Sequence, residues 1–289
     1  MGSDRFDIDE GLLPRIVTLA EEAGAILRAR LPVAGAAEAP LDVQYKGGRD
    51  LVTAADCASE DHILTGLASL APGVPILSEE QPDPGVRGGP LWIVDPLDGT
   101  TNFAHGHPLY TVSIALVVDG VPQLAVTHAP EWTRRGSNAG STWSARRGRG
   151  AHGPSGAPLK VSPETDLSKA LLATGFSYGR EELGTGGLDL FAQLLREARE
   201  IRRGGSACLD LAFCAEGIFA GFWEADLKPH DVAAGALLIE EAGGTVTDYR
   251  GEGDWLFGRS LIAGGAVIHA ELLRRVEEHW QFDRETGRG

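Results

Sequence analysis

Residues 92–103, WIVDPLDGTTNF, decide how the rest of this sequence is interpreted. An apolar run stops at Asp95, the chain turns at Pro96, and a second carboxylate follows at Asp98. Two carboxylates in one tight turn repel each other unless cations lie between them, and Mg²⁺ takes carboxylate, carbonyl and water oxygens as ligands. We therefore predict a buried strand that ends in a metal site, with the carbonyl of Leu97 between the two acids.

The residues that follow Asp98 have the properties of an anion-binding site. Gly99 lets the backbone approach a ligand closely. The run GTTNF is predicted to begin a helix, whose free N–H groups and dipole bind anions. Carboxylate-held Mg²⁺ beside such a helix start describes a phosphate site. The chain contains no G-x-x-x-x-G-K-[ST] motif, so this site is not a P-loop.

Further acids stand at the ends of predicted elements, where binding sites are usually built. Glu79 follows an apolar strand and Asp231 opens a helix, so both are candidates to complete the metal site. A single acid at a helix start is usually a cap. Asp56 stands three residues after Thr53, which is the spacing of a capping box for the helix predicted in 50–70.

The length and the net charge restrict the domain organisation and the class of partner. The 289 residues suit one large domain or two tightly fused halves. The net charge of −15 argues against nucleic acid or an anionic membrane as the main partner. A small anionic substrate is still compatible with this charge, because metal ions invert the local field of an acidic site.

Cysteine usage and the absence of long apolar runs favour a cytoplasmic protein. Three cysteines without zinc-like spacing are expected to be buried, reduced thiols, typical of a reducing compartment: Cys57, Cys208 and Cys214. The acidic N-terminus MGSDRFDIDE does not resemble a secretory signal. No apolar run reaches the ~20 residues that a membrane helix needs.

Hydrophobic periodicity predicts a layered α+β fold more than a doubly wound parallel sheet, because helices are mixed with antiparallel hairpins. Helices are predicted within 8–31, 50–70, 188–201, 207–217, 232–243 and 269–280. Strands are predicted within 74–80, 90–95, 111–130, 218–224 and 244–249. The segment 131–156, rich in Gly, Ser and Arg, is either a hairpin or a mobile surface segment, and its arginines are interpreted as a solvated face.

Two long motifs resemble the signatures of the inositol monophosphatase family. WIVDPLDGTTNF is similar to the first and WEADLKPHDVAAGALLIEEAGG to the second, while DLVTAADCASE and SEE match two further blocks in the expected order. The resemblance covers roughly residues 10–270. It implies a layered α-β-α-β-α sandwich of the sugar-phosphatase type. It also implies one domain over 1–289, with a metal-site half at about 10–150 and a substrate-pocket half at about 160–275.

The resemblance implies roles for individual positions. The implied metal ligands are Glu79, Asp95, the carbonyl of Leu97, Asp98 and Asp231. The implied catalytic residues, which bind or orient the attacking water, are Thr100, Asp56 and Glu79. The implied substrate contacts are the N–H groups of Gly99 and Thr100 for the phosphate, Glu224 for substrate hydroxyls, and Ser206 and Ala207 for the sugar pocket.

The implied activity is Mg²⁺-dependent hydrolysis of a phosphate monoester by an activated water, with inositol monophosphate as the favoured substrate. Fructose 1,6-bisphosphate, histidinol phosphate and adenosine 3',5'-bisphosphate are the alternatives, and Asn102 and Glu224 favour the inositol branch. A sugar-phosphate-binding protein without turnover is a remote alternative, because the predicted machinery is complete. Family members commonly form homodimers and are inhibited by lithium, so both properties are expected here.

Two positions depart from the family pattern. Ser78 replaces the usual Gly before the Glu pair, which is expected to matter little. His230 stands where a Trp commonly precedes the ligand Asp231. A histidine there could tune substrate choice, but we expect it to pack or to support the site and not to be a metal ligand. His105 and His107 have no acid or cysteine at usable spacing and are interpreted as surface or structural residues.

Overall fold

The structure is a computed structural model that describes residues 8–32, 44–47, 50–133, 140–176 and 185–280. Its helices are α1 (Leu12–Arg28), α2 (Ala54–Leu70), α3 (Thr100–Ala104), α4 (Thr185–Glu197), α5 (Ala207–Ala215), α6 (Pro229–Glu241) and α7 (Ala266–His279). Its strands are β1 (Gln44–Gly47), β2 (Asp50–Val52), β3 (Ile76–Ser78), β4 (Pro90–Asp98), β5 (Thr111–Val118), β6 (Val121–Ala129), β7 (Ser141–Arg146), β8 (Ala151–His152), β9 (Leu171–Thr174), β10 (Glu200–Arg202), β11 (Gly221–Ala225), β12 (Thr245–Thr247) and β13 (Ser260–Gly264).

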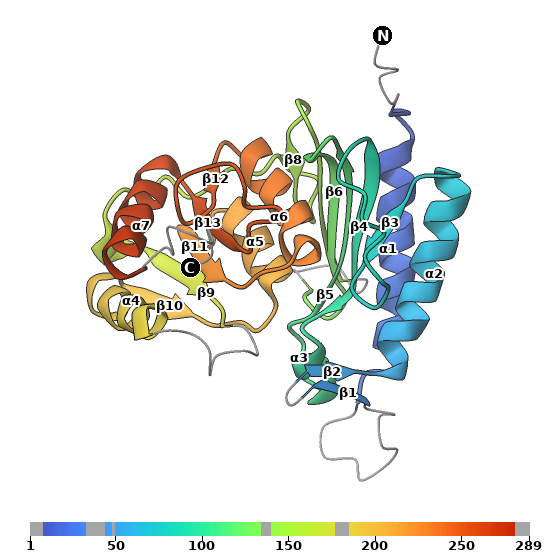
Figure 1. The fold of residues 1–289 in the computed structure, drawn as a ribbon, viewed down its shortest axis with the longest axis horizontal. Coiled ribbons are helices and arrows are strands. Elements are labelled where there is room, and N and C mark those ends of the chain that lie inside the picture. Colours follow the sequence, from blue (N-terminus) through green and yellow to red (C-terminus); the bar gives the residue numbers. More distant parts are fainter. Residues whose placement is uncertain (1–7, 33–43, 48–49, 134–139, 177–184, 281–289) are drawn as a thin grey trace.

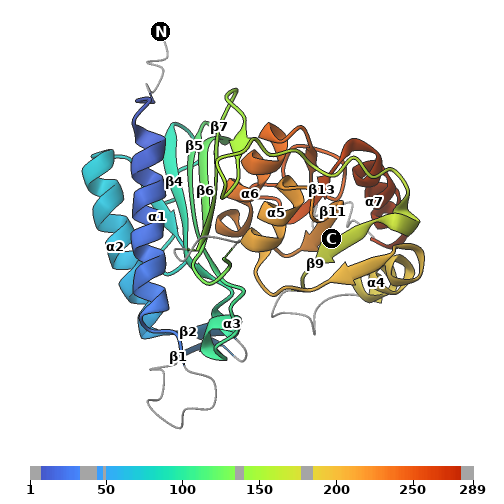
Figure 2. The ribbon, with the colours of Figure 1, turned by 180° about the vertical axis from the view of Figure 1, so that it is seen from behind.

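The larger elements stack in alternating layers of helices and sheets (Figures 1 and 2). α1 and α2 cover one face of a six-stranded sheet with the order β3-β4-β5-β6-β7-β8. α5 and α6 lie between this sheet and a five-stranded sheet with the order β10-β9-β11-β13-β12. α4 and α7 cover the outer face of the second sheet. The predicted α+β class and its α-β-α-β-α layering are therefore confirmed.

Strand β4 is buried on both faces, which explains its continuous apolar sequence. Leu91 and Ile93 pack in the core with α5 and α6, whereas Trp92 and Val94 pack in the core with α1 and α2. Successive side chains of a strand point to opposite faces, so a strand between two helical layers needs apolar residues at every position. This burial fixes the end of β4, and the acids that follow, inside the molecule.

A β-bulge at the end of β4 brings Asp95 and Asp98 to one site. Asp95 pairs with Ser113 of β5 and Asp98 pairs with Thr111, so three steps along β4 match two steps along β5. In a regular strand, residues three apart face opposite sides of the sheet. The extra residue removes this difference. The sequence predicted a strand ending at Asp95 and a turn at Pro96, but β4 continues to Asp98 and Pro96 lies within the bulge.

The second sheet supplies one wall of a cavity that the first sheet also lines. β10, β9 and β11 run parallel, so the residues after their carboxyl ends lie at one edge of the sheet. Phe222 of β11 packs toward α5 and α6, and the next residue, Trp223, packs toward α4 and α7. Glu224 follows at the same carboxyl edge.

Several local predictions are wrong, and the reason is long-range pairing. The helix predicted to 201 ends at Glu197, because residues 200–202 pair with β9 as the edge strand β10. The short strands β9 and β13 lack a local signal and were not predicted.

Cys57 is exposed and not buried, whereas Cys208 and Cys214 are buried as expected. In the described part of 131–156, β7 and β8 form a hairpin, and 134–139 lie outside the described residues.

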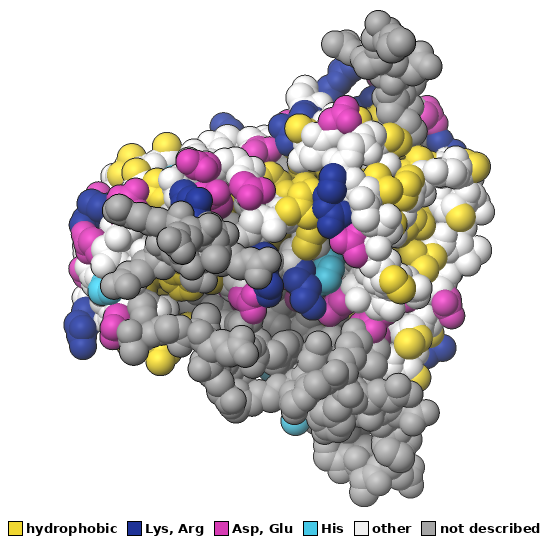
Figure 3. All heavy atoms as spheres, in the orientation of Figure 1, with side chains coloured by type: hydrophobic (Ala, Val, Ile, Leu, Met, Phe, Trp, Pro, Cys, Tyr) yellow, Lys and Arg dark blue, Asp and Glu magenta, His cyan; other side chains and the backbone are white. Residues whose placement is uncertain are grey.

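The described surface offers two further observations. On the face drawn in Figure 3, basic and acidic side chains are interspersed, as expected for a solvated surface. Within the ranges that the structure describes, no helix combines the length and the apolar character needed to cross a membrane.

Candidate active site

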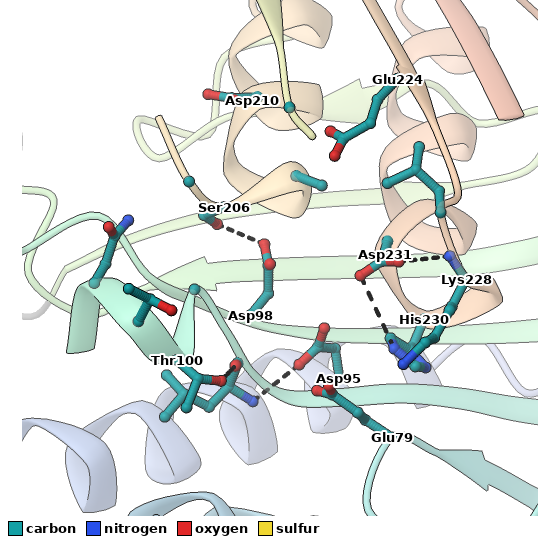
Figure 4. Close-up of a pocket in the computed structure, with 18 of the residues that line it drawn as sticks. Glu79, Asp95, Asp98, Thr100, Ser206, Asp210, Glu224, Lys228, His230 and Asp231 are labelled. Atoms are coloured by element: carbon teal, nitrogen blue, oxygen red, sulfur yellow. Dashed lines mark hydrogen bonds and ion pairs between the residues drawn. The ribbon is translucent and has the colours of Figure 1, made fainter. Parts of the chain in front are cut away.

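A cavity of about 370 Å³ is lined by residues from both sheets and from the first turns of α3, α5 and α6 (Figure 4). The predicted site residues that line it are Glu79, Asp95, Leu97, Asp98, Gly99, Thr100, Ser206, Ala207, Glu224 and Asp231. The remaining predicted residue, Asp56, is buried and accepts a hydrogen bond from Thr100 at 3.3 Å. Folding thus brings together acids that are up to 175 positions apart in sequence (Asp56 and Asp231, 231 − 56).

Among the described residues, two overlapping groups of side chains have the geometry to hold a metal ion. One group contains Asp95, Asp98 and Asp231, and the other contains Glu79, Asp95 and His230. Within each group, one ligand atom per residue lies within 4.8 Å of the others. Asp95 belongs to both groups, so it would be a common ligand if both positions held a cation.

Crowding and burial raise the pKa values of these carboxylates. Burial, followed by the charges of Glu79 and Asp98, raises the pKa of Asp95 well above its usual range. Burial raises the pKa of Asp231 to about 6. Burial, with the charge of Asp231 as the next cause, raises the pKa of Asp98 to about 6. A divalent cation would offset this desolvation and repulsion, and the carboxylate oxygens fit a hard ion such as Mg²⁺.

Asp98 is held in place by the start of α5. Its Oδ2 accepts hydrogen bonds from the Ser206 hydroxyl at 2.5 Å and from the Cys208 backbone N–H at 2.8 Å. Ser206 is also the N-cap of α5, and its oxygen accepts a bond from the Leu209 N–H at 3.3 Å. Ser206 therefore connects the second half of the chain to a metal-site acid, in addition to lining the cavity.

Behind the ligands, α2 supports the end of β4 and the Glu79 segment. The Ser59 hydroxyl donates to the carbonyl of Pro96 at 2.8 Å, which fixes the bulge. Glu60 is buried and accepts bonds from the hydroxyl of Ser78 and from Gln81 Nε2. Ser78 and Gln81 flank Glu79 and Glu80 in the chain, so the Ser that replaces the family's usual Gly has a bonded partner.

Gly99 and Asn102 hold the segment that follows β4 against the loop that precedes α5. Gly99 has φ +92°, and a Cβ there would lie 3.0 Å from the carbonyl oxygen of Leu109, so the position requires glycine. The Asn102 amide donates to the carbonyls of Leu109 at 2.6 Å and Gly204 at 2.9 Å. The D-G-T-T-N segment is therefore fastened to the loop that precedes α5.

The cavity is also lined by polar residues that sequence reasoning missed in part. Glu224 was predicted, but Asp210, Arg203 and Lys228 also line the cavity. Burial, followed by the charge of Asp98, raises the pKa of Asp210 to about 8. A signal was present, because Asp210 is a single acid in the otherwise apolar run of α5. Buried polar groups that line a cavity are candidates to bind substrate hydroxyls.

The layered fold and the acid-lined cavity define a protein of the sugar-phosphatase type. The chain belongs to the inositol monophosphatase family, whose family model matches residues 10–281. Membership in this family supports phosphatase activity at a metal-dependent site.

Known proteins resemble this chain over most of its length. It is 38% identical over 273 residues to Phosphatase IMPL1, chloroplastic, of Arabidopsis thaliana, covering 91% of this chain and 70% of the relative. It is 38% identical over 244 residues to a Pseudomonas aeruginosa protein named Nus factor SuhB, covering 83% and 87%. The solved inositol monophosphatase from Anabaena (Nostoc) sp. PCC 7120 is 36% identical, with a TM-score of 0.80, covering 94% of this chain and 97% of that one.

Proposed function

We propose that this chain hydrolyses a phosphate monoester of a polyol, with inositol monophosphate as the substrate, in a reaction that requires Mg²⁺. The observation that carries the proposal is the convergence of Asp95, Asp98 and Asp231 on one wall of a cavity whose other wall holds Glu224. The first wall suits cations and the phosphate that they bind, and the second suits hydroxyl groups.

In the proposed reaction, Mg²⁺ would be held by Glu79, Asp95, Asp98, Asp231 and the carbonyl of Leu97. When bound, the metal ions neutralise the phosphate charge and activate a water molecule for attack. The backbone N–H groups of Gly99 and Thr100 are assigned to the phosphate oxygens. No covalent enzyme intermediate is needed, because positioning and charge neutralisation supply most of the rate in phosphoryl transfer.

Thr100 is the residue proposed to aim the attacking water. Its hydroxyl proton is directed to Asp56 or to the carbonyl of Leu97, so a lone pair of its oxygen is available to accept a bond from water. This arrangement would hold the water in line with the bond to the departing alcohol. The alcohol leaves with a proton that the attacking water releases. Inorganic phosphate stays beside the acids that would hold the metal ions.

The substrate's hydroxyl groups are proposed to contact Glu224, with Ser206 and Ala207 shaping the pocket and Asp210 nearby. Burial, with the charges of Asp231 and Asp210 as the next causes, raises the pKa of Glu224 well above its usual range. Its carboxyl oxygens can accept hydrogen bonds from the hydroxyl groups of a polyol.

Phosphate release from a panel of esters tests the proposal. The panel contains inositol 1-phosphate, fructose 1,6-bisphosphate, histidinol phosphate and adenosine 3',5'-bisphosphate, each with Mg²⁺ and with Mg²⁺ plus excess chelator. We expect metal-dependent release with preference for the inositol ester. Preference for another ester would keep the metal site and change the specificity. No release from any ester would favour a sugar-phosphate-binding protein without turnover.

Other properties stay predictions, drawn from the family resemblance except for the cytoplasmic location, which was drawn from the cysteine usage and the lack of long apolar runs. These are the homodimeric state, the inhibition by lithium, the cytoplasmic location and the division into a metal-site half and a substrate-pocket half. Light scattering in solution tests the first, and a lithium titration of phosphate release tests the second.

A further inference from the structure

His230 lies among the metal-binding acids, although its sequence position did not indicate a ligand. One nitrogen of its imidazole and one carboxylate oxygen each of Glu79 and Asp95 all lie within 4.8 Å of one another. Figure 4 shows His230 and Glu79 on the same side of Asp95, away from Asp98. The second group therefore offers a cation one nitrogen and two carboxylates, whereas the first group offers three carboxylates.

The fold holds His230 firmly in this place. It is the second residue of α6 and is 7% exposed. Pro229 fixes the start of the helix, and the backbone carbonyl of His230 lies 3.6 Å from the Cys208 thiol of α5. His230 Nε2 lies 3.9 Å from Asp231 Oδ1, so the imidazole also neighbours an acid of the first group. A side chain held in this way needs little rearrangement to coordinate an ion.

An imidazole changes which cation a site prefers. Mg²⁺ is strongly hydrated and takes oxygen ligands, whereas imidazole nitrogen suits iron, nickel, copper and zinc; Mn²⁺, which also takes oxygen ligands, is the weakest binder of this series and therefore the most stringent test ion. The group with three carboxylates and the group with one imidazole nitrogen would therefore differ in their affinities for the same dications. A Trp at this position would offer no lone pair, because the indole nitrogen only donates.

We propose that Glu79, Asp95 and His230 form a cation position that binds first-row transition-metal dications, with Mn²⁺ as the test ion, through the imidazole nitrogen of His230. This proposal rests on the proposed function, since Glu79 and Asp95 are also assigned to Mg²⁺ there. It revises the expectation that His230 only packs or supports the site.

Pulsed electron paramagnetic resonance of the Mn²⁺-loaded full chain tests the proposal without measuring activity. A coordinated imidazole gives an electron spin echo modulation from ¹⁴N, so we expect this modulation in the wild-type chain. It should disappear in His230→Gln, and it should also disappear in wild-type chain labelled with ¹⁵N-histidine. The labelled chain carries no substitution, so this result does not depend on the folding of a variant.

Binding constants supply a second measurement. We expect His230→Gln to raise the Kd of Mn²⁺ about 10-fold and to raise the Kd of Mg²⁺, measured by competition, by less. His152→Gln is the matched control, because His152 is an exposed residue of β8 and should leave the modulation and both constants unchanged.

The outcomes separate this inference from the proposed function. If Mn²⁺ binds, Asp98→Asn weakens it, and the wild-type echo shows no ¹⁴N modulation, the acidic metal site stands and the role of His230 is wrong. Modulation that persists in His230→Gln would also overturn the role of His230. If the wild-type chain binds neither Mn²⁺ nor Mg²⁺, the proposed function and this inference both fail.

Discussion

The hydroxyl oxygen of Thr100 lies 3.3 Å from Asp56 Oδ1, although the two residues belong to different helices, α3 and α2. The other oxygen of Asp56 accepts bonds from the Thr53 N–H at 2.9 Å and the Thr53 hydroxyl at 2.6 Å. Asp56 is fully buried, and this burial raises its pKa against the opposing effect of the Thr53 bonds. One carboxylate thus caps α2 and contacts Thr100, so its structural role and its proposed catalytic role have to be separated.

The first prediction separates the two roles of Asp56. Asp56→Asn should lower kcat for the best substrate by about 10²- to 10⁴-fold, because the bond that orients Thr100 is weakened. Thr53→Ala removes the other partner of the same cap and should cost about 1 kcal/mol of stability, while kcat stays near wild type. Chemical denaturation and steady-state kinetics of both variants measure this. Equal loss of kcat in the two variants would show that Asp56 acts through the cap alone.

The second prediction concerns Asp98 and metal removal. Asp98→Asn keeps an oxygen that can accept bonds from Ser206 and the Cys208 N–H, so the chain should fold. Mg²⁺ should raise the melting temperature of the wild-type chain by mass action and raise that of Asp98→Asn much less. Most phosphatase activity should be lost in the variant.

Melting curves with Mg²⁺ and with a chelator, recorded for both proteins, provide the check. In chelator at pH 8, Asp98→Asn should be at least as stable as wild type, because the substitution removes one of several buried like charges. An identical Mg²⁺ shift in both proteins, or near-normal turnover of the variant, would remove Asp98 from the metal site.

Some parts of this site could be predicted from local sequence, whereas the pairing of Thr100 with Asp56 and the role of Glu224 were implied only by the family resemblance. Thr53 and Asp56 form the predicted capping box, and the apolar run before Asp95 is the buried strand β4. The bulge that re-aims Asp98 could not be predicted, because it depends on the register between β4 and β5. Long-range pairing also decides β9, β10 and β13.

Asp210 was missed as a site residue, and His230 was not expected to be a ligand, for a different reason. The sequence of each helix already explains the residue without a site. Asp210 is an acid in the first turn of α5, and His230 is a buried residue at the start of α6. Their neighbours in the cavity come from other elements, such as Glu224 of β11 and Glu79 after β3. Only the assembled layers bring these side chains together.

The third prediction concerns recognition of the polyol by Glu224. Glu224→Leu should raise KM for inositol 1-phosphate about 10-fold, because substrate hydroxyls lose a buried partner. Glu224→Gln should have a smaller effect, because an amide of similar shape keeps an oxygen that can accept a bond from a substrate hydroxyl.

Kinetics with two substrates distinguish recognition from general damage to the site. p-Nitrophenyl phosphate carries no hydroxyl groups, so its KM should stay near wild type in both Glu224 variants. Asp226→Asn is the matched control, because Asp226 lines the same cavity and its left-handed backbone (φ 65°) tolerates Asn. A parallel rise of KM for both esters would argue against a role in hydroxyl recognition.

The last prediction concerns stability in acid and depends on His128 of β6. The ring is 1% exposed and packs so closely on α1 that a Cβ at Gly24 would lie 2.4 Å from it. Its Nδ1 lies 2.9 Å from the Thr142 hydroxyl, which donates to Glu21 at 2.9 Å, so Nδ1 carries the proton of a neutral imidazole. Burial, followed by the charge of Arg28, lowers the pKa of His128 to about 4.

A histidine with this pKa weakens the fold as the pH falls. Between pH 6.5 and about 4 the unfolded chain binds the proton and the folded chain does not, so folding loses about 3 kcal/mol across this window and nothing further below it. His128→Asn lacks the titrating group, so the free energy of unfolding of the wild type should fall by about 3 kcal/mol more than that of the variant between pH 7 and 4. Denaturation at several pH values measures the free energy of unfolding of both proteins. The cavity carboxylates are the same in both, so their opposing effects cancel in the difference between wild type and variant. His152→Gln, an exposed control, should follow the wild type. Parallel curves for wild type and His128→Asn would mean that His128 takes up its proton without unfolding.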